Sequence, residues 1–288
     1  MSNTFKSVIL LGTLTGLLVV MGQVLGGNTG MIIAFGMAVV MNFASYWFSD
    51  QIAMRMAGAR EVSPEEAPQL HAIVEQLAYQ AQLPKPRVAI VESPSPNAFA
   101  TGRDKDHSLV AVTTGILQIL NRDELMAVLG HELGHVKNRD ILVTSIAATV
   151  AGAIMMIAHM LQFAAFFGGL GGYGGRDERG GMNPLAALAM IILAPIAATM
   201  IQMAISRSRE YGADDTGAHI VGDPLALASA LAKLEAGSKR MPMDVSPAAA
   251  PLFIVNPLSG QMIAGLFSTH PPIEERIKRL RQMAGYPA

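Results

Sequence analysis

The stretch "GHELGHVKNRDILVTSIAATVAG", residues 130–152, decides the fold because it joins a polar half to an apolar half. The polar half contains His131, Glu132 and His135 in the pattern H-E-x-x-H, which is typical of a zinc site. The apolar half opens a block without Asp, Glu, Lys or Arg that runs from residue 141 to residue 175. The sequence therefore predicts a hydrolytic metal site directly beside a membrane-spanning segment.

The two histidines lie on a predicted helix. Residues 121–124, "NRDE", have the form of a capping box, so a helix begins there and continues past His135. On that helix His131 and His135 are one turn apart on the same face, so both rings can reach one zinc ion. Glu132 can reach a metal-activated water without being a ligand, which is the position of a general base. The chain has no Cys, so the ligands of any metal must be His, Glu or Asp.

The third zinc ligand must come from another segment. A catalytic zinc takes three protein ligands and keeps one position open. The longer pattern H-E-x-x-H-x-x-G-x-x-H requires Gly at position 138 and His at position 141, where this chain has Asn138 and Ile141. That class of zinc site is therefore excluded.

The segment "SRSREYGADD", residues 206–215, supplies the predicted third ligand. Glu210 and Asp214 are four residues apart, so they share one helical face. Glu210 is expected to bind zinc, and Asp214 is expected to accept the second N–H of a ligand histidine. His219 is the alternative ligand, although it lies beyond Glu210 and off that face. The spacing alone leaves open that both acids are ordinary surface residues.

The N-terminal part of the chain predicts a helical hairpin in a membrane. Residues 7–49 carry no charged side chain and are divided by the turn cluster "GGNTG", residues 26–30. Each half, 7–26 and 31–49, has about the 20 apolar residues that a bilayer crossing needs. The alternative is a cleaved signal peptide over the first half, but no A-x-A site follows and a second apolar segment comes at once.

Two further spans are expected at 141–165 and 184–205, on either side of the flexible sequence "GGLGGYGGRDERGG". The alternative of buried core helices is disfavoured by their length without a charge. The sequence leaves open whether this pair crosses the membrane fully or enters and returns. The high share of hydrophobic residues, 51%, against 15% charged residues also fits a membrane protein with a soluble part.

Lys and Arg placement predicts the orientation of these spans. One side of the membrane carries Lys6, Arg55, Arg60, Lys137, Arg139, Arg207 and Arg209, and the other carries only Arg176 and Arg179. This puts the N-terminus and residues 50–140 and 207–288 in the cytoplasm. His135 and Glu210 can meet only if the third and fourth spans return to the same side, which the charges independently require. The net charge of −1 gives no reason to expect a nucleic acid partner.

The soluble parts predict a mixed α and β structure. A capping box at residues 63–66 predicts a helix that ends before Pro84. The expected strands are 87–92, 108–114 and a short edge strand at 97–101. Further helices are expected from Asp223-Pro224 and after Pro271-Pro272, and the proline-rich residues 237–261 are expected to form a loop.

Taken together, the chain resembles the HtpX family of bacterial membrane zinc endopeptidases. The resemblance covers nearly the whole chain and rests on the two N-terminal spans together with "NAFATG" (97–102), "HELGH" (131–135), "SRSREYGAD" (206–214) and "STHPP" (268–272). It implies an α-helical integral membrane protein, with four transmembrane helices as two hairpins, and a cytoplasmic α+β zincin-like (gluzincin) protease domain. The predicted segments are a first hairpin (1–50), a protease part (51–140), a second hairpin (141–206) and a second cytoplasmic part (207–288).

The resemblance also implies the chemistry and the setting. It implies one Zn2+ per chain with ligands His131, His135 and Glu210, and Glu132 as the base. The implied substrates are misfolded or damaged membrane proteins, and the other expected partners are the lipid bilayer and other membrane quality-control proteins. The expected location is the bacterial inner membrane, as a multi-pass protein with the active site on the cytoplasmic side.

Two further site predictions follow by analogy with zinc peptidases. Asn97, Ala98, Phe99, Ala100 and Thr101 are expected to pair with a substrate peptide as an added strand, against the alternative of a plain hairpin edge. His270 is a candidate donor to the oxyanion or to Glu210, against a capping or packing role. Tyr211 is another candidate oxyanion donor, although its position next to Glu210 is more typical of packing.

Two other classes of function fit the sequence less well than hydrolysis. A zinc-binding membrane scaffold or chaperone would have no need of Glu132. A transporter is disfavoured because the predicted spans hold almost no ionisable residues to line a path.

Overall fold

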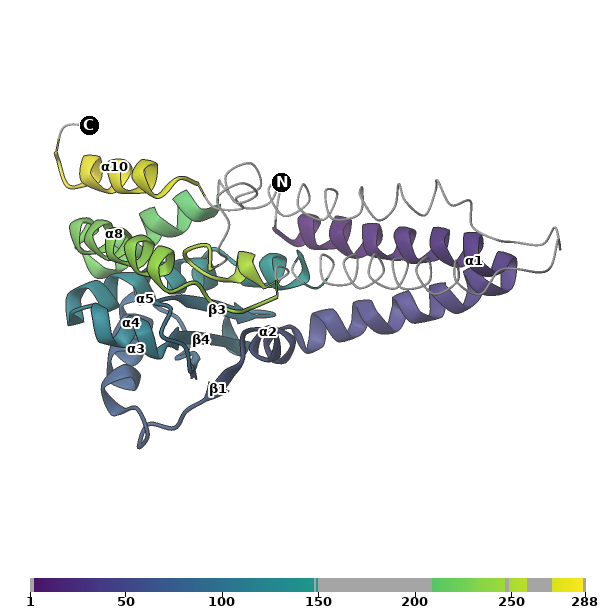
Figure 1. Cartoon of the computed structure of the whole chain (residues 1–288), viewed down its shortest axis with the longest axis horizontal. Helices are drawn as coiled ribbons and strands as arrows, with labels where there is room; N and C mark the ends of the chain where they lie inside the picture. Colours follow the sequence, from purple (N-terminus) through teal and green to yellow (C-terminus); the bar gives the residue numbers. More distant parts are fainter. Residues whose placement is uncertain (1–2, 148, 150–208, 247–248, 258–270, 287–288) are drawn as a thin grey trace.

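The computed structural model describes residues 3–147, 149, 209–246, 249–257 and 271–286. Its described part consists of a long helical hairpin that projects from a body of one sheet and several helices (Figure 1). The body holds both segments of the predicted metal site, and the hairpin extends away from it.

The hairpin is formed by α1 (Asn3–Trp47), which folds back on itself at Gly27, where φ is +57°. Gly22 and Gly30 let the two halves touch, because a Cβ on Gly22 would lie 2.4 Å from the carbonyl oxygen of Gly30. Asn42 Nδ2 donates to Thr15 Oγ1 across the two halves at 2.8 Å. The predicted hairpin is thus confirmed as a fold.

The described residues contain one helix that is long and apolar enough to cross a membrane, Gly27–Trp47, with a mean hydropathy of 1.5. Only 11% of its most apolar window is buried, so its apolar side chains face outward. The predicted third and fourth spans lie almost wholly outside the described residues. The first seven residues of the predicted third span, 141–147, are helical.

The sheet has the order β1-β2-β4-β3, formed by β1 (Ala59–Glu61), β2 (Arg87–Val91), β4 (Ser108–Thr113) and β3 (Ala98–Gly102). The central pair β2 and β4 is parallel, and the two outer pairs are antiparallel. The three strands predicted from the sequence are confirmed to within one residue at each end, and β3 is at the predicted edge. The short β1 was missed because three residues are too few to show an alternating pattern.

Both faces of the sheet are covered. Side chains alternate between the faces, so Val88, Ala98 and Val110 join the larger core cluster while Ala89, Phe99 and Leu109 join the smaller one. The larger cluster includes side chains of α3 (Pro68–Ala81), α5 (Arg122–Lys137) and α8 (Pro224–Arg240), and the smaller one includes side chains of α2 (Ser49–Ala57) and residues 249–253. The shorter helices are α4 (Thr114–Ile119) and α10 (Ile273–Met283), with 3-10 turns η1 (Lys105–His107) and η2 (Ala250–Leu252).

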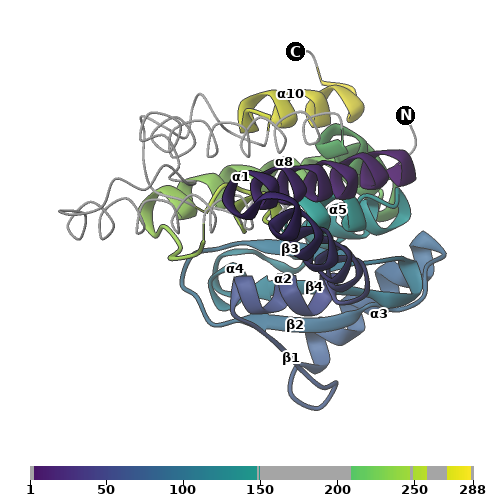
Figure 2. The same ribbon diagram turned by 90° about the vertical axis from the view of Figure 1, so that its right-hand side faces the viewer.

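Three helices, two of which carry site residues, gather on the β3 side of the sheet. In Figure 2, which looks along the hairpin toward the body, α5, α8 and α10 follow one another above β3, and β1 lies at the opposite side of the sheet. The α5 helix begins with the predicted capping box, in which the Asn121 and Glu124 side chains each bind the other residue's backbone N–H. This helix therefore starts where the sequence predicted and carries the H-E-x-x-H pattern past the edge strand.

The predicted start of α3 was wrong. Ser63 and Glu66 form the hydrogen bonds of a capping box, with Ser63 N donating to Glu66 Oε2 at 2.9 Å. These bonds close only a turn, and the helix begins at Pro68. The reason is Pro68 itself, which disfavours helical geometry at Ala67, where φ is −137° and ψ is 60°.

The prediction of a loop over residues 237–261 was wrong in part. The α8 helix continues to Arg240, and residues 250–252 form η2. Gly237 does not end the helix but provides a packing contact, because a Cβ there would lie 2.4 Å from Pro96 Cγ. The helix stops only before Pro242, as expected for the residue that precedes a proline.

Candidate metal centre

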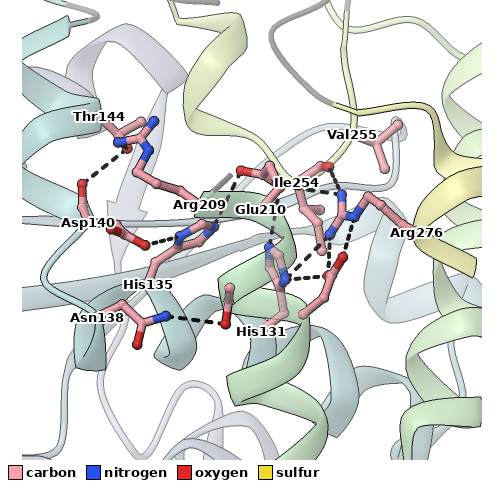
Figure 3. Close-up of polar contacts among 12 residues, drawn as sticks. His131, His135, Asn138, Asp140, Thr144, Arg209, Glu210, Ile254, Val255 and Arg276 are labelled. Carbon is pink, nitrogen blue, oxygen red and sulfur yellow. Dashed lines mark hydrogen bonds and ion pairs between the residues drawn. The ribbon is translucent and has the colours of Figure 1, made fainter. Parts of the chain in front are cut away.

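Three predicted ligands come together inside the body. His131, His135 and Glu210 each offer one ligand atom, and these atoms lie within 4.8 Å of one another. Glu210 Oε2 is 3.7 Å from His131 Nε2, and Glu210 Oε1 is 3.6 Å from His135 Nε2. The two histidines and the glutamate therefore converge on one point from two segments far apart in the sequence, as Figure 3 shows.

Close packing of two helices places Glu210 opposite the histidines. The helix over residues 209–221 lies against α5, and glycines stand at the points of contact. A Cβ on Gly217 would lie 2.6 Å from the backbone nitrogen of His131, and a Cβ on Gly134 would lie 2.8 Å from the carbonyl oxygen of Ala213. Both neighbours are backbone atoms, which cannot move aside, so only glycine allows this approach.

Asp214 lies where the sequence predicted an acceptor for a ligand histidine. Its Oδ1 is 2.8 Å from His131 Nδ1, which leaves His131 Nε2 directed at Glu210. A carboxylate on the second ring nitrogen fixes the tautomer and the orientation of a metal-binding histidine. Burial lowers the pKa of His131, which keeps the ring in the neutral form that binds a metal.

The other histidine has a similar partner that sequence reasoning missed. Asp140 Oδ2 is 3.3 Å from His135 Nδ1. The chain turns back after α5 because Arg139 has a positive φ of 58°, and Asp140 N then donates to the carbonyl oxygen of His135 at 2.8 Å. No spacing rule predicts this turn, and the only available signal was an aspartate five residues after a ligand histidine.

Two guanidinium groups accompany these carboxylates. Arg276 of α10 forms two hydrogen bonds with Asp214, and Arg209 Nη1 donates to Thr144 Oγ1 at 2.9 Å beside Asp140 (Figure 3). Neither arginine was predicted from the sequence to lie at the metal site. Arg276 joins the site from the helix farthest along the chain, so no local pattern could have placed it there.

The charges of the site fit a divalent cation. The described site holds four buried carboxylates, Glu132, Asp140, Glu210 and Asp214, and two arginines, Arg209 and Arg276. With all six groups ionised the net charge is −2, and with Glu132 protonated it is −1, so in both cases negative charge remains to be balanced. His131 Nε2 is also buried without a hydrogen bond among the described residues. A set of two imidazoles and one carboxylate suits zinc in a catalytic site, so these residues fit the predicted metal.

Glu132 is buried beside the cluster and is not one of its ligands. Burial raises its pKa to about 7, and the nearby charge of Glu210 acts in the same direction. His135, Arg276 and a hydrogen bond from the backbone of Ala100 lower the pKa in part. A carboxyl with a pKa near neutrality is suited to accept and return a proton.

The predicted substrate strand divides into one residue at the site and four with structural contacts. The Ala100 backbone touches the Glu132 carboxylate from β3. The Asn97 side chain instead binds the backbone of Val255 through both its nitrogen, at 2.8 Å, and its oxygen, at 3.3 Å. The Ala98 carbonyl accepts a hydrogen bond from Ile254 N. Phe99 packs against Phe253 on the face of the sheet that holds the smaller core cluster. Thr101 Oγ1 forms a hydrogen bond with Ser145 Oγ.

The remaining candidates are not brought to the metal cluster. His219 is exposed, and its Nδ1 lies 2.6 Å from the carbonyl oxygen of Asp215, so the structure favours Glu210 over His219 as the third ligand. Tyr211 has the guanidinium carbon of Arg279 4.2 Å from its ring centre, a packing contact. His270 lies outside the described residues.

Comparison with known proteins gives consistent matches. The model of peptidase family M48 matches residues 64–284. A protease HtpX homolog from Desulfatibacillum aliphaticivorans is 56% identical over 280 residues, which are 97% of this chain and 89% of that protein. One from Pyrococcus furiosus is 56% identical over 277 residues, which are 96% of this chain and 94% of that protein.

A solved structure shares the fold. The crystal structure of S. mikatae Ste24p matches 96% of this chain and 65% of that chain with a TM-score of 0.52 and 20% sequence identity. This chain therefore spans somewhat less than two thirds of Ste24p, and at this identity the likeness concerns the fold alone.

Proposed function

The chain belongs to peptidase family M48 and is a metalloprotease, and from this premise we propose that it is a zinc-dependent membrane endopeptidase acting on misfolded or damaged membrane proteins. The observation that carries the proposal is the convergence of His131, His135 and Glu210 with a buried glutamate, Glu132, beside them. A purely structural zinc site would have no use for that glutamate, whose burial disfavours its ionised form.

The residues of the site divide the work of peptide hydrolysis. When bound by the three ligands, zinc would polarise the scissile carbonyl and acidify a water molecule. Glu132 accepts the proton of the attacking water and returns it to the leaving amine, because it lies buried beside the ligand cluster without being one of the ligands. Asp214 and Asp140 hold the two imidazoles in the orientation that binds the metal.

The substrate binds in extended form along the edge of β3 that no other described strand pairs with. Because β3 pairs with β4 on one side only, alternate backbone groups face away from the sheet. The Ala98 carbonyl is already bound by Ile254, and the Ala100 backbone N–H donates to Glu132, which leaves the Ala100 carbonyl for a peptide. A peptide added at Ala100 and Gly102 would therefore pass directly beside the base. His270 is the proposed oxyanion donor.

The protein acts at a membrane, with its site on the cytoplasmic side of the bacterial inner membrane. The hairpin supports this setting, because its second helix exposes large apolar side chains such as Ile32, Phe35 and Val40. Ser145 and Arg209 are described helical residues that come before and after residues 150–208 in the sequence, and both contact the site region. The lipid bilayer, membrane-protein substrates and other membrane quality-control proteins are the proposed partners.

The proposal is tested with the full-length protein purified in detergent. We expect it to cleave casein and to cleave itself, to stop when a chelator removes the metal, and to resume when zinc is added. Proteolysis that continues unchanged after complete removal of the metal would contradict the proposed zinc chemistry.

The substrate class needs a separate comparison. In liposomes, a membrane protein and a destabilised variant of it would be offered to the enzyme together. Faster cleavage of the destabilised form is expected. Equal rates for both forms would contradict the preference for misfolded proteins while leaving the zinc chemistry intact.

A further inference from the structure

Arg276 is the largest fully buried side chain in the described part of the protein, with 0% of its surface exposed. It lies on the buried stripe of α10 between Ile273 and Leu280, at a position where an amphipathic helix ordinarily carries an apolar residue. Arginine is almost never fully buried unless it is paired. A specific set of contacts must therefore hold Arg276 there.

The contacts of Arg276 reach two segments of the site, the helix over residues 209–221 and residues 249–257. Its Nε donates to Asp214 Oδ2 at 2.8 Å, and its Nη2 donates to Asp214 Oδ1 at 2.7 Å, so the two groups form a bidentate pair. Its Nη1 donates to the carbonyl oxygen of Ile254 at 3.1 Å. The same Nη1 lies 3.4 Å from Glu210 Oε2, as Figure 3 shows.

These contacts orient Asp214, which in turn orients the metal ligand His131. Asp214 Oδ1 is shared between Arg276 and His131, so the plane of the carboxylate determines the direction of the imidazole. The second bond, to Oδ2, prevents the carboxylate from rotating about its bond to the chain. His131 Nε2 then points at Glu210.

We propose that Arg276 is a positioning residue that sets the metal affinity through Asp214 and joins residues 249–257 to the metal site. The proposal rests on the proposed zinc site and adds to it the group that orients the ligand His131. It requires the planar fork of arginine, because a lysine ammonium is a point charge and cannot form the bidentate pair and the bond to Ile254 together.

The sign of the effect separates positioning from charge. A guanidinium 3.4 Å from Glu210 repels a cation, so its charge alone would weaken metal binding. If charge were its only influence, loss of Arg276 would strengthen zinc binding. If it positions Asp214, loss of the fork weakens zinc binding even where the positive charge is kept.

The experiment measures zinc affinity by competition with a chelator, using the full-length protein in detergent. For Arg276→Lys we expect binding weakened by about 10- to 100-fold, the usual effect of losing a group that orients a metal ligand. The matched control is Arg281→Lys, an exposed position on the same helix, for which no change is expected. An affinity for zinc in Arg276→Lys equal to or above that of the parent would overturn the proposal.

A double-mutant cycle with Asp214→Asn tests whether Arg276 acts through Asp214. We expect the double variant to bind zinc about as weakly as Asp214→Asn alone, because both changes break one pathway. Full additivity of the two losses would contradict this route. If Arg276→Lys fails to fold, as judged by circular dichroism, Asp214→Asn alone tests the proposal. The asparagine amide NH2 faces the guanidinium donor to donor, so the bidentate pair is lost. An unchanged zinc affinity of Asp214→Asn would overturn the proposal.

The outcome is separable from that of the proposed function because metal binding, not proteolysis, is measured. A parent protein that binds no zinc would sink both ideas. If the parent binds zinc tightly and Arg276→Lys binds it with equal affinity, only the proposed role of Arg276 is contradicted.

Discussion

Glu132 is predicted to destabilise the metal-free protein, and its removal should reveal this. The side chain is 2% exposed, and burial raises its pKa from 4.5 to about 7. A carboxyl whose pKa is higher in the folded state binds its proton more tightly there than in the unfolded state. The free energy of unfolding therefore falls as the pH rises from the unfolded pKa to about 7, because the folded protein must then hold a buried carboxylate. A difference of this size corresponds to about 3 kcal/mol.

The perturbation is Glu132→Gln, which keeps the shape of the side chain and removes its charge. In the metal-free protein at about pH 8, where the parent must bury a carboxylate, the variant should be more stable by about 3 kcal/mol. For a chain of this size that is a rise in melting temperature of roughly 6–12 °C. At about pH 5 the buried carboxyl is protonated, so the two proteins should differ by less than about 1 kcal/mol.

The assay is thermal unfolding followed by circular dichroism in detergent, with a chelator present. The control is Glu92→Gln, at an exposed carboxylate, which should have the same small effect at both pH values. A difference between Glu132→Gln and the parent that does not change between the two pH values would refute the reasoning. Addition of zinc should remove most of the difference, because a cation beside Glu132 stabilises its ionised form.

Three further predictions concern the ligands and the packing that positions them. Glu210→Ala should abolish zinc binding while the fold is kept, and a full metal content by elemental analysis would exclude Glu210 as a ligand. Gly217→Ala should destabilise the protein and weaken zinc binding, because the new Cβ would lie 2.6 Å from backbone atoms of α5. The control is Gly212→Ala, in which the new Cβ meets only a side-chain atom at 3.8 Å. This variant should be neutral or slightly stabilising. Equal effects of these two substitutions would contradict the packing argument. Asn97→Ala should lower the free energy of unfolding by roughly 2 kcal/mol, because the buried backbone N–H and C=O of Val255 lose their hydrogen-bond partners. An unchanged melting temperature would restore Asn97 as a candidate for substrate binding.

Local patterns predicted the parts of the site that are set locally. The capping box at Asn121 fixed the start of α5, and the spacing of His131 and His135 on that helix placed both rings on one face. The spacing of Glu210 and Asp214 likewise predicted that they would act on the same side of their helix. Each of these inferences depends on residues within about one turn of each other, where helical geometry alone determines the arrangement.

The parts that could not be predicted depend on tertiary packing or on single backbone angles. Arg276 reaches the site from a helix that begins more than 60 residues after Glu210, and its burial is visible only in the folded protein. Asp140 turns back to His135 because Arg139 adopts a left-handed conformation, which its sequence does not signal. Gly237 is conventionally read as the end of a helix, whereas here it allows contact with Pro96.

The identity of the base is the central claim, and one comparison tests it directly. Parent and Glu132→Gln would be purified in detergent, loaded to the same measured zinc content and compared for cleavage of casein. We expect equal zinc content and a loss of activity of about 100-fold or more in the variant, because general base catalysis contributes about that much. Cleavage by the zinc-loaded variant at the rate of the parent would contradict the account.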